Sequence, residues 1–168
     1  MCSSDLAPIV DVMMLAGLYT IRIVAGAAAT GIALSFWLLA FSMFLFLSLA
    51  IVKRYAELHD AARAGRTAAA GRGYSAADLP LLLALGTASG LAAVVVLALY
   101  ISSPDSALLY THERPLWLIC PLLLYWISRV WLLTTRGEMH DDPILFAIRD
   151  RASLALVGVI SVLVAIAV

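Results

Sequence analysis

The sequence predicts an all-α protein, a polytopic bundle of transmembrane helices. Of its 168 residues 64% are apolar and only 13% are charged, which is not the composition of a soluble domain. The apolar residues gather in runs of about 20, the length that a helix needs to cross a bilayer. These runs are continuous rather than alternating, which favours helices over the strands of a barrel.

Five runs are long enough, or nearly long enough, to cross a membrane. We expect helices at residues 12–30, 32–52, 79–103, 115–135 and 152–168. The first contains Arg22, the fourth contains Arg129, and the fifth is short. Gly and Ala recur in the first and third runs, where small residues would allow close helix packing, although an alanine-rich composition explains them equally well.

Residues 1–6, MCSSDL, have neither the basic start nor the apolar middle of a signal peptide. The codons TGC TCT TCC GAT CTN encode Cys-Ser-Ser-Asp-Leu and match the end of a common sequencing adapter. We therefore interpret residues 1–6 as a sequence artefact and residues 7–168 as part of a transmembrane domain. The alternative is a short, disordered cytoplasmic tail.

Basic residues are divided unevenly between the predicted loops. The loops that follow the second and fourth runs contain most of them: Lys53, Arg54, Arg63, Arg66, Arg72, Arg136, Arg149 and Arg151. The positive-inside rule then places both loops in the cytoplasm and the last residue outside. The net charge is zero and the basic residues are scattered, so the sequence offers no surface for nucleic acid.

The segment KRYAELHD, residues 53–60, follows the second run directly. On a helix Lys53, Glu57 and Asp60 share one face, and Arg54 points about 100° away. Lys53 and Arg54 could hold phosphate oxygens, and the two carboxylates could hold a Mg²⁺ ion that bridges phosphates. The alternative is a basic membrane anchor in which a Lys53/Glu57 pair only solvates the helix end.

Two arginines lie inside apolar runs. Arg22 is about two and a half turns within the first run, where a charge is costly and usually faces a polar interior. Asp11 and Tyr19 fall near the same side of that helix, so a shared polar stripe with Arg22 is one interpretation. The other is that Arg22 extends to the inner membrane surface, which is also the expectation for Arg129.

The segment RGEMHDDPILFAIRDR, residues 136–151, has the acidic residues and the histidine of a metal site. Its local pattern favours a different interpretation, because Asp142 followed by Pro143 is typical of a helix start. We therefore predict a short helix at the membrane interface, leading into the last run. Motifs of serine hydrolases, phosphate-binding loops and zinc proteases do not occur in the sequence.

Four stretches together resemble a known family: LYTIRIVAGA, the run that ends in KRYAEL, RGYSAADLP, and LLYWISRVWLLTTRGEMHDDPILFAIRDR. They resemble the C-terminal half of the UbiA superfamily of membrane prenyltransferases, and within it the branch of polyprenyl-phosphate phosphoribosyltransferases. The resemblance covers residues 7–168. It implies a fold of nine helices around a cavity open to the membrane, of which the five runs would be the last five.

The resemblance also implies roles for particular residues. It assigns catalysis to Arg22, Lys53 and Arg54, adds Tyr19 as a substrate-binding residue, and places Glu57 and Asp60 as metal ligands. Two departures stand against it. Many members carry two aspartates four positions apart where Glu57 and Asp60 are three apart, and the first aspartate-rich motif of the family, NDxxDxxxD, does not occur in this sequence.

The function expected from the residues and the resemblance is Mg²⁺-dependent transfer in a bacterial inner membrane, with the active-site loops in the cytoplasm. The substrates would be a polyprenyl phosphate or diphosphate and a second, polar molecule. Both prenyl transfer and phosphoribosyl transfer stay open. This chain by itself is expected to be inactive, and the alternative of another class is a small non-enzymatic membrane protein or transporter subunit.

Overall fold

The computed structural model describes residues 6–31, 35–65, 74–112, 114–139 and 142–168. Within these ranges the chain is helical and contains no strand element, which confirms the predicted class. The long helices are α1 (Leu6–Thr30), α2 (Phe36–Arg63), α3 (Leu79–Ile101), α5 (Ile119–Thr135) and α7 (Arg151–Ala167). Short helices lie between them: η1 (Ala76–Asp78), α4 (Pro104–Leu109), η2 (Arg114–Leu118) and α6 (Pro143–Arg149).

Four helical segments are long and apolar enough to cross a membrane. They are Ile9–Thr30, Phe36–Arg63, Ala76–Ile101 and Arg114–Thr135, and each overlaps one of the first four predicted runs. The fifth run corresponds to α7, which has 17 residues and is shorter than a typical span of about 20. Of residues 1–6, only Leu6 lies within the described ranges, as the first residue of α1.

Helix α2 continues well beyond the predicted end of its run at residue 52. Its last three turns bury Tyr55, Leu58 and Ala61 against the rest of the bundle, so an apolar stripe persists after the membrane-like sequence stops. The helix ends at Arg63, and Gly65 follows with a φ of 72°, a conformation that glycine adopts freely. KRYAELHD therefore lies within a helix, and its charged residues are held at fixed positions.

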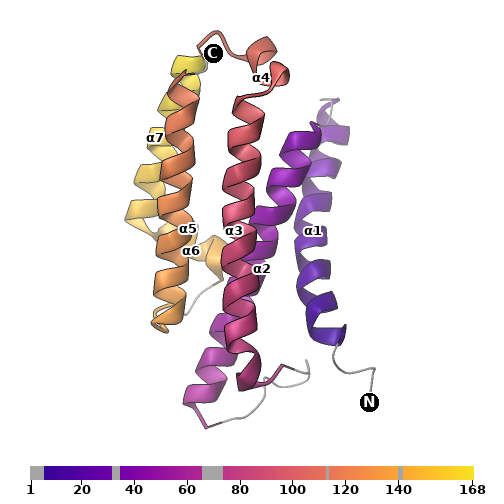
Figure 1. Ribbon diagram of the computed structural model, residues 1–168, viewed down its shortest axis with the longest axis vertical. Coiled ribbons are helices and arrows are strands. Elements are labelled where there is room, and N and C mark those ends of the chain that lie inside the picture. Colours follow the sequence, from indigo (N-terminus) through magenta and orange to yellow (C-terminus); the bar gives the residue numbers. More distant parts are fainter. Residues whose placement is uncertain (1–5, 32–34, 66–73, 113, 140–141) are drawn as a thin grey trace.

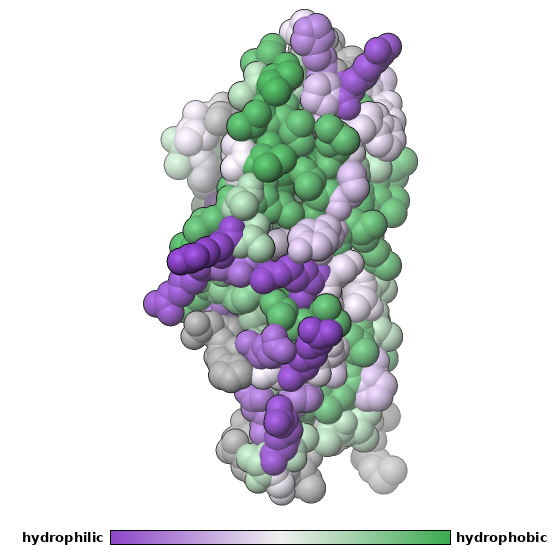
Figure 2. All heavy atoms as spheres, turned by 90° about the vertical axis from the view of Figure 1, so that its left-hand side faces the viewer, coloured by the Kyte–Doolittle hydropathy of each residue, from purple (hydrophilic) through white to green (hydrophobic). Residues whose placement is uncertain are grey.

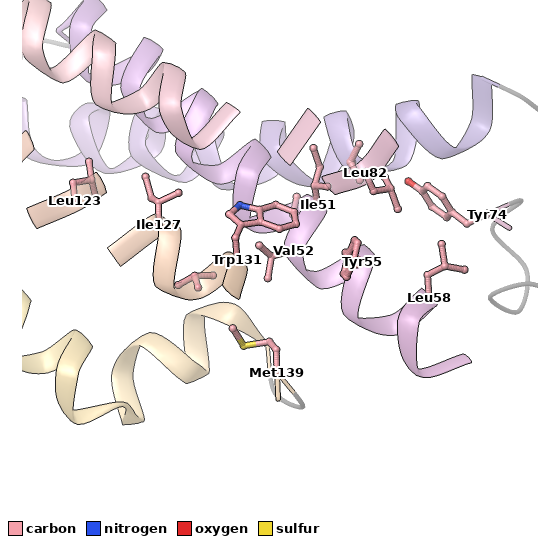
Figure 3. Close-up of a cluster of buried hydrophobic side chains, with 13 residues drawn as sticks. Ile51, Val52, Tyr55, Leu58, Tyr74, Leu82, Leu123, Ile127, Trp131 and Met139 are labelled. Carbon is pink, nitrogen blue, oxygen red and sulfur yellow. The ribbon is translucent and has the colours of Figure 1, made fainter. Parts of the chain in front are cut away.

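Helices α2 and α3 occupy the middle of the bundle, with α1 on one side and α5 and α7 on the other (Figure 1). Glycines bring α3 and α5 close together: a Cβ atom at Gly86 would lie 2.1 Å from the ring of Trp131. The Ser48 hydroxyl donates to the Gly86 carbonyl (2.7 Å) and accepts from Trp131 Nε1 (3.1 Å). Figure 3 shows Trp131 among buried side chains of α2 and α5, including Val52 and Ile127.

Apolar and polar surfaces separate along the long axis of the bundle. On the face in Figure 2 hydrophobic side chains cover much of the upper half beneath a hydrophilic top, and further hydrophilic ones gather at mid-height and below. Helix α6 lies at about mid-height, where α7 begins (Figure 1). It starts at Pro143, as the Asp-Pro pattern predicted, and the Phe146 amide donates to the Asp142 carbonyl (2.9 Å). The short helix thus lies at the boundary between the two surfaces.

Candidate functional site

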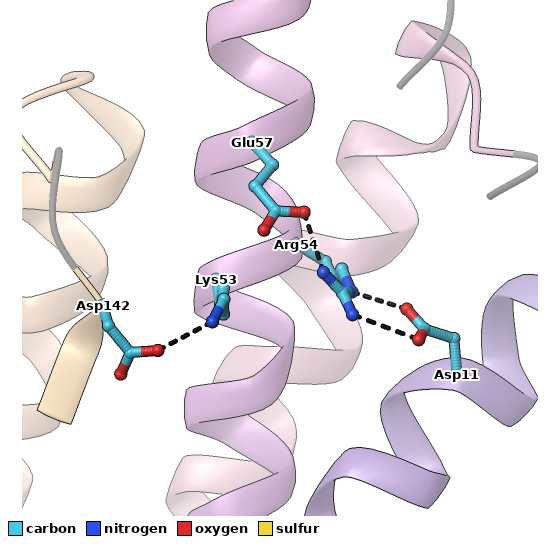
Figure 4. A network of polar contacts seen from close by, with 5 residues as sticks. All are labelled: Asp11, Lys53, Arg54, Glu57 and Asp142. Carbon is cyan, nitrogen blue, oxygen red and sulfur yellow. Dashed lines mark hydrogen bonds and ion pairs between the residues drawn. The ribbon is translucent and has the colours of Figure 1, made fainter. Parts of the chain in front are cut away.

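Five charged side chains lie where α1, α2 and α6 approach one another, in two contacting sets: Lys53 with Asp142, and Arg54 with Asp11 and Glu57 (Figure 4). We call them the charged cluster: Asp11 of α1, Lys53, Arg54 and Glu57 of α2, and Asp142, which precedes α6. The extension of α2 beyond its apolar run places Lys53, Arg54 and Glu57 beside the other two elements. The cluster thus combines residues that are as many as 131 positions apart, between Asp11 and Asp142.

Arg54 is the buried centre of the charged cluster, with a side chain only 5% exposed. Its Nε and Nη2 donate to the two carboxylate oxygens of Asp11, at 2.5 and 3.1 Å, and its Nη1 donates to Glu57 Oε2 at 2.8 Å. A planar guanidinium suits such two-pronged contacts, which hold both partners in a defined geometry. Arg54 therefore links α1 to α2 and orients Glu57.

Lys53 is the more accessible cation of the charged cluster, at 37% exposure, and its Nζ donates to Asp142 Oδ2 at 2.8 Å. The Lys53–Asp142 pair borders a small pocket between α1, α2 and α6. Its walls are Leu15, Tyr19, Phe46, Leu49, Ala50, Lys53, Asp142 and Pro143. The free volume is about 10 Å³, room for at most one water molecule, so the pocket is nearly filled.

The pairing differs from the Lys53/Glu57 pair of the alternative interpretation of KRYAELHD. Glu57 contacts Arg54, three positions earlier, rather than Lys53, four positions earlier, because Asp142 draws the Lys53 ammonium toward α6. Asp60 is 56% exposed, and its Oδ1 lies 3.9 Å from His59 Nδ1. Among the described residues, no three His, Cys, Asp or Glu side chains gather as a metal site.

The polar stripe that was one interpretation of α1 is formed only in part, between Tyr19 and Arg22. Asp11 contacts Arg54 on the neighbouring helix, because eleven residues of helix separate it from Arg22 by roughly 16 Å. Arg22 is exposed and lies over the ring of Tyr19, 5.3 Å from its centroid. Tyr19 in turn stacks on Phe46 and lines the small pocket. The structure thus brings Tyr19, but not Arg22, to the wall that Lys53 shares.

Arg129 has a carboxylate partner that the sequence analysis missed. Its Nη1 and Nη2 contact the two oxygens of Asp150 at 2.6 and 3.1 Å, just before α7. Partial burial raises the pKa of the Asp150 carboxyl, but hydrogen bonds from Arg129 and Ser153 outweigh it and hold the pKa below its ordinary value. Asp142 and Asp150 flank α6, so each end of this helix is joined by an ion pair to a long helix.

Several curated proteins are similar to the chain. It is 40% identical to the uncharacterized protein y4nM of Sinorhizobium fredii over 147 residues, and 36% identical to the nodulation protein NoeC of Azorhizobium caulinodans over 152 residues. It is 30% identical to the decaprenyl-phosphate phosphoribosyltransferase of Mycobacterium tuberculosis over 162 residues, which are 95% of this chain. The chain is a distant homologue of this transferase.

The chain spans about half the length of the transferase and of NoeC, and less of y4nM: 51%, 48% and 28% respectively. No protein-family model matches it, and no solved structure does. The relationship supports the predicted resemblance to the phosphoribosyltransferase branch at the level of distant homology. The homologue is a transferase, and four of the described helices of this chain are long and apolar enough to cross a membrane.

Proposed function

We propose that the protein is a membrane phosphoribosyltransferase of the UbiA type, which joins a phosphoribosyl group to a polyprenyl phosphate. The observation that carries the proposal is the charged cluster, set at the boundary between the apolar and polar parts of a helix bundle that is homologous to such an enzyme. A lipid phosphate at a membrane surface would lie at this boundary. The protein would reside in the bacterial inner membrane with the charged cluster facing the cytoplasm.

The reaction needs stabilisation of negative charge more than proton transfer. An oxygen of the lipid phosphate attacks the anomeric carbon of a ribose that carries a diphosphate, the bond from that carbon to the diphosphate breaks, and the diphosphate leaves. The nucleophile is already an anion, so no general base is required. A cation beside the leaving group favours the transition state because charge accumulates there as the bond breaks.

Lys53 is the residue that we assign to this role. Its ammonium is partly exposed and lies at the rim of the small pocket, whereas the donors of Arg54 already contact two carboxylates. We therefore propose that Lys53 contacts phosphate oxygens directly and that Arg54 acts as a positioning residue, through Glu57. Tyr19 would contact the substrate from the opposite wall of the pocket.

The charge balance of the cluster supports a requirement for Mg²⁺. Within the charged cluster three carboxylates accompany two cations, so its two cations alone do not offset the several negative charges of a diphosphate, and a metal ion would supply further positive charge. Mg²⁺ is commonly held by one or two carboxylates together with substrate phosphates. Glu57 and Asp60 fit that donor set and would hold the ion, which would supply neutralisation of the leaving group.

Apolar space for part of an isoprenoid chain lies in the other half of the bundle. Two cavities of about 310 and 260 Å³ share Phe41, Leu97, Tyr100 and Tyr110, between α2, α3 and the segment that follows α4. Hydrocarbon buried there would leave water and contact side chains of its own polarity. These cavities support a lipid as one of the two substrates.

Transfer in membranes tests the proposal. The protein, expressed from its complete gene and placed in lipid nanodiscs, receives labelled phosphoribosyl diphosphate, a polyprenyl phosphate and Mg²⁺, and labelled lipid is extracted. We expect turnover that falls by about tenfold or more in Lys53→Gln. The matched control is Arg114→Gln, which removes one exposed cation at η2 and should leave turnover unchanged.

A second arm of the same assay distinguishes the remaining functions. If product formed only from a polyprenyl diphosphate and a prenyl acceptor, the function would be prenyl transfer rather than phosphoribosyl transfer. Absence of turnover with either substrate pair, in protein that unfolds cooperatively on heating, would favour the non-enzymatic membrane protein. Turnover that Lys53→Gln leaves intact would remove the charged cluster from the mechanism.

A further inference from the structure

Asp142 contacts Lys53, the side chain that the proposed reaction needs. Its carboxylate accepts from Lys53 Nζ at 2.8 Å, a contact that a phosphate oxygen would make in the same geometry. Asp142 also forms part of the wall of the small pocket, and so does its neighbour Pro143, the first residue of α6. The carboxylate and the start of α6 therefore cover Lys53 and the pocket together.

The other end of α6 is held independently. Asp150 contacts Arg129 of α5 through two hydrogen bonds, and it accepts from the Ser153 amide (2.8 Å) at the start of α7. Displacing Asp142 from Lys53 would thus remove the ion pair that joins the start of α6 to α2, while the ion pair between Asp150 and Arg129 would remain. A small rotation of a seven-residue helix about that attached end would widen a pocket whose free volume is now about 10 Å³.

We propose that Asp142 is an intramolecular substitute for the substrate phosphate, which holds Lys53 and keeps the pocket closed until a diphosphate displaces it. The inference rests on the function proposed above and adds a positioning residue and an order of events to it. A diphosphate accompanied by Mg²⁺ competes with a single carboxylate for Lys53. Once Asp142 is displaced, the wall formed by Tyr19 and Phe46 becomes accessible to the lipid substrate.

Competition of this kind has a measurable size. The apparent dissociation constant for diphosphate equals the intrinsic constant divided by the fraction of molecules in which Lys53 is released. The partly exposed ion pair between Lys53 and Asp142 lowers that fraction by a modest factor. Removing the charge of Asp142 should therefore tighten diphosphate binding about threefold to tenfold.

The experiment measures binding of inorganic diphosphate with Mg²⁺ to the complete protein in nanodiscs by calorimetry. Asp142→Asn should bind more tightly and Asp142→Glu, which can still pair with Lys53, about as the wild type does. Asparagine serves well at a helix start, so α6 should form in the variant, and Asp142→Ser provides a second replacement with the same property. The matched control is Glu138→Gln, which removes an exposed carboxylate from the same connecting segment.

A double-variant comparison shows whether Asp142 acts through Lys53. In a Lys53→Gln background, Asp142→Asn should have no further effect on diphosphate binding. The inference would be overturned if Glu138→Gln tightened diphosphate binding as much as Asp142→Asn does. It would also be overturned if neither Asp142→Asn nor Asp142→Ser tightened binding. Both outcomes would leave the proposed function intact. If the Lys53→Gln variant bound diphosphate as tightly as the wild type does, the proposed function and this inference would both be wrong.

Discussion

Arg54 shows how one buried side chain can determine the arrangement of its neighbours. It contacts carboxylates on two helices while only 5% of its side chain is exposed. A buried charge is tolerated when its donors are matched, and removing it leaves the partner charges without compensation. Asp11 and Glu57 are partly exposed, so water would relieve some of that penalty. The link between α1 and α2 should therefore depend strongly on Arg54.

The first prediction concerns this arginine. Arg54→Met should lower the free energy of unfolding by about 2 to 3 kcal/mol, because two carboxylates lose their shared partner. Asp11→Asn should cost less, since Glu57 still compensates Arg54. Titration with a denaturing detergent, followed by circular dichroism, measures both. Arg63→Met, at the exposed end of α2, is the control, and an equal effect there would contradict the assignment.

The second prediction concerns the pH dependence of the Asp150 contact. Because the folded pKa of Asp150 lies below its ordinary value of 3.8, the contact adds stability at all pH values above that ordinary value. This stability is lost as the pH falls through the lowered folded pKa. The difference in unfolding free energy between wild type and Asp150→Asn should thus be constant from pH 7 to about 5 and shrink below about 4. A difference unaffected by acid would show that the carboxylate charge is not involved.

Glycine spacing on α3 determines how closely the central helices pack. A methyl group at Gly86 would lie 2.1 Å from the Trp131 ring, which is buried and hydrogen-bonded and has little freedom to move. Gly90 has the same relation to Ile127, at 2.6 Å. The close contact of α3 with α5 therefore requires glycine at these two positions.

The third prediction follows from that contact. Gly86→Ala should destabilise the bundle by about 1 to 3 kcal/mol through overpacking, even though alanine favours helix. Gly158→Ala on α7 is the matched control, because its Cβ would meet nothing within 4 Å and the helix should gain slightly in stability. Unfolding in detergent measures both variants. Equal behaviour of the two would mean that the Gly86 contact is unimportant.

The presence of a helix could be predicted wherever a local sequence pattern determines it. Continuous apolar runs identified the long helices, and the Asp142–Pro143 pair identified the start of α6. The end of α2 could not be predicted, because it depends on burial of Tyr55 and Leu58 against residues that are distant in the sequence. Helix existence is a local property, whereas helix length here depends on packing.

The residues of KRYAELHD could be named from the sequence, but their partners could not. Lys53 is 89 positions from Asp142, and Arg54 is 43 positions from Asp11. Such pairs depend on which helices become neighbours, and periodicity along one helix cannot supply that information. One signal was available for Asp11: a carboxylate at the edge of an apolar run favours a cationic partner, and Asp11 directly precedes the first run. Metal ligation by Glu57 and Asp60 stays a prediction.

At the scale of the whole molecule, the distribution of basic residues predicts the orientation. The end of the bundle that includes the C-terminal turns of α2 and α5 should face the cytoplasm, and the loop between α4 and η2 should face outside. The face in Figure 2 agrees with a bilayer at the level of the upper half, where hydrophobic side chains cover much of that face beneath a hydrophilic top. The proposed chemistry depends on this orientation, because the phosphoribosyl diphosphate would have to reach the charged cluster from the cytoplasm.

The fourth prediction tests the orientation. In a background with Cys2→Ser and Cys120→Ala, single cysteines replace Glu138 and Thr111, which are both exposed. A membrane-impermeant maleimide added to intact cells should label the cysteine at position 111 and leave that at 138 unlabelled. Permeabilised cells, in which both positions should react, are the control. The reverse pattern would place the charged cluster outside and contradict the proposed function.

The two hydrogen bonds of Ser48 are compatible with assembly in the order of synthesis. Its hydroxyl has a single proton, which goes to the Gly86 carbonyl, so its oxygen remains free to accept from Trp131 Nε1. Helices α2 and α3 leave the ribosome before α5, and their pairing alone fixes the direction of that hydroxyl. When α5 enters the bilayer it meets an acceptor that is already aligned for its indole. The growing chain can therefore complete its central pair first and add α5 afterwards, without rearranging a bond that has already formed.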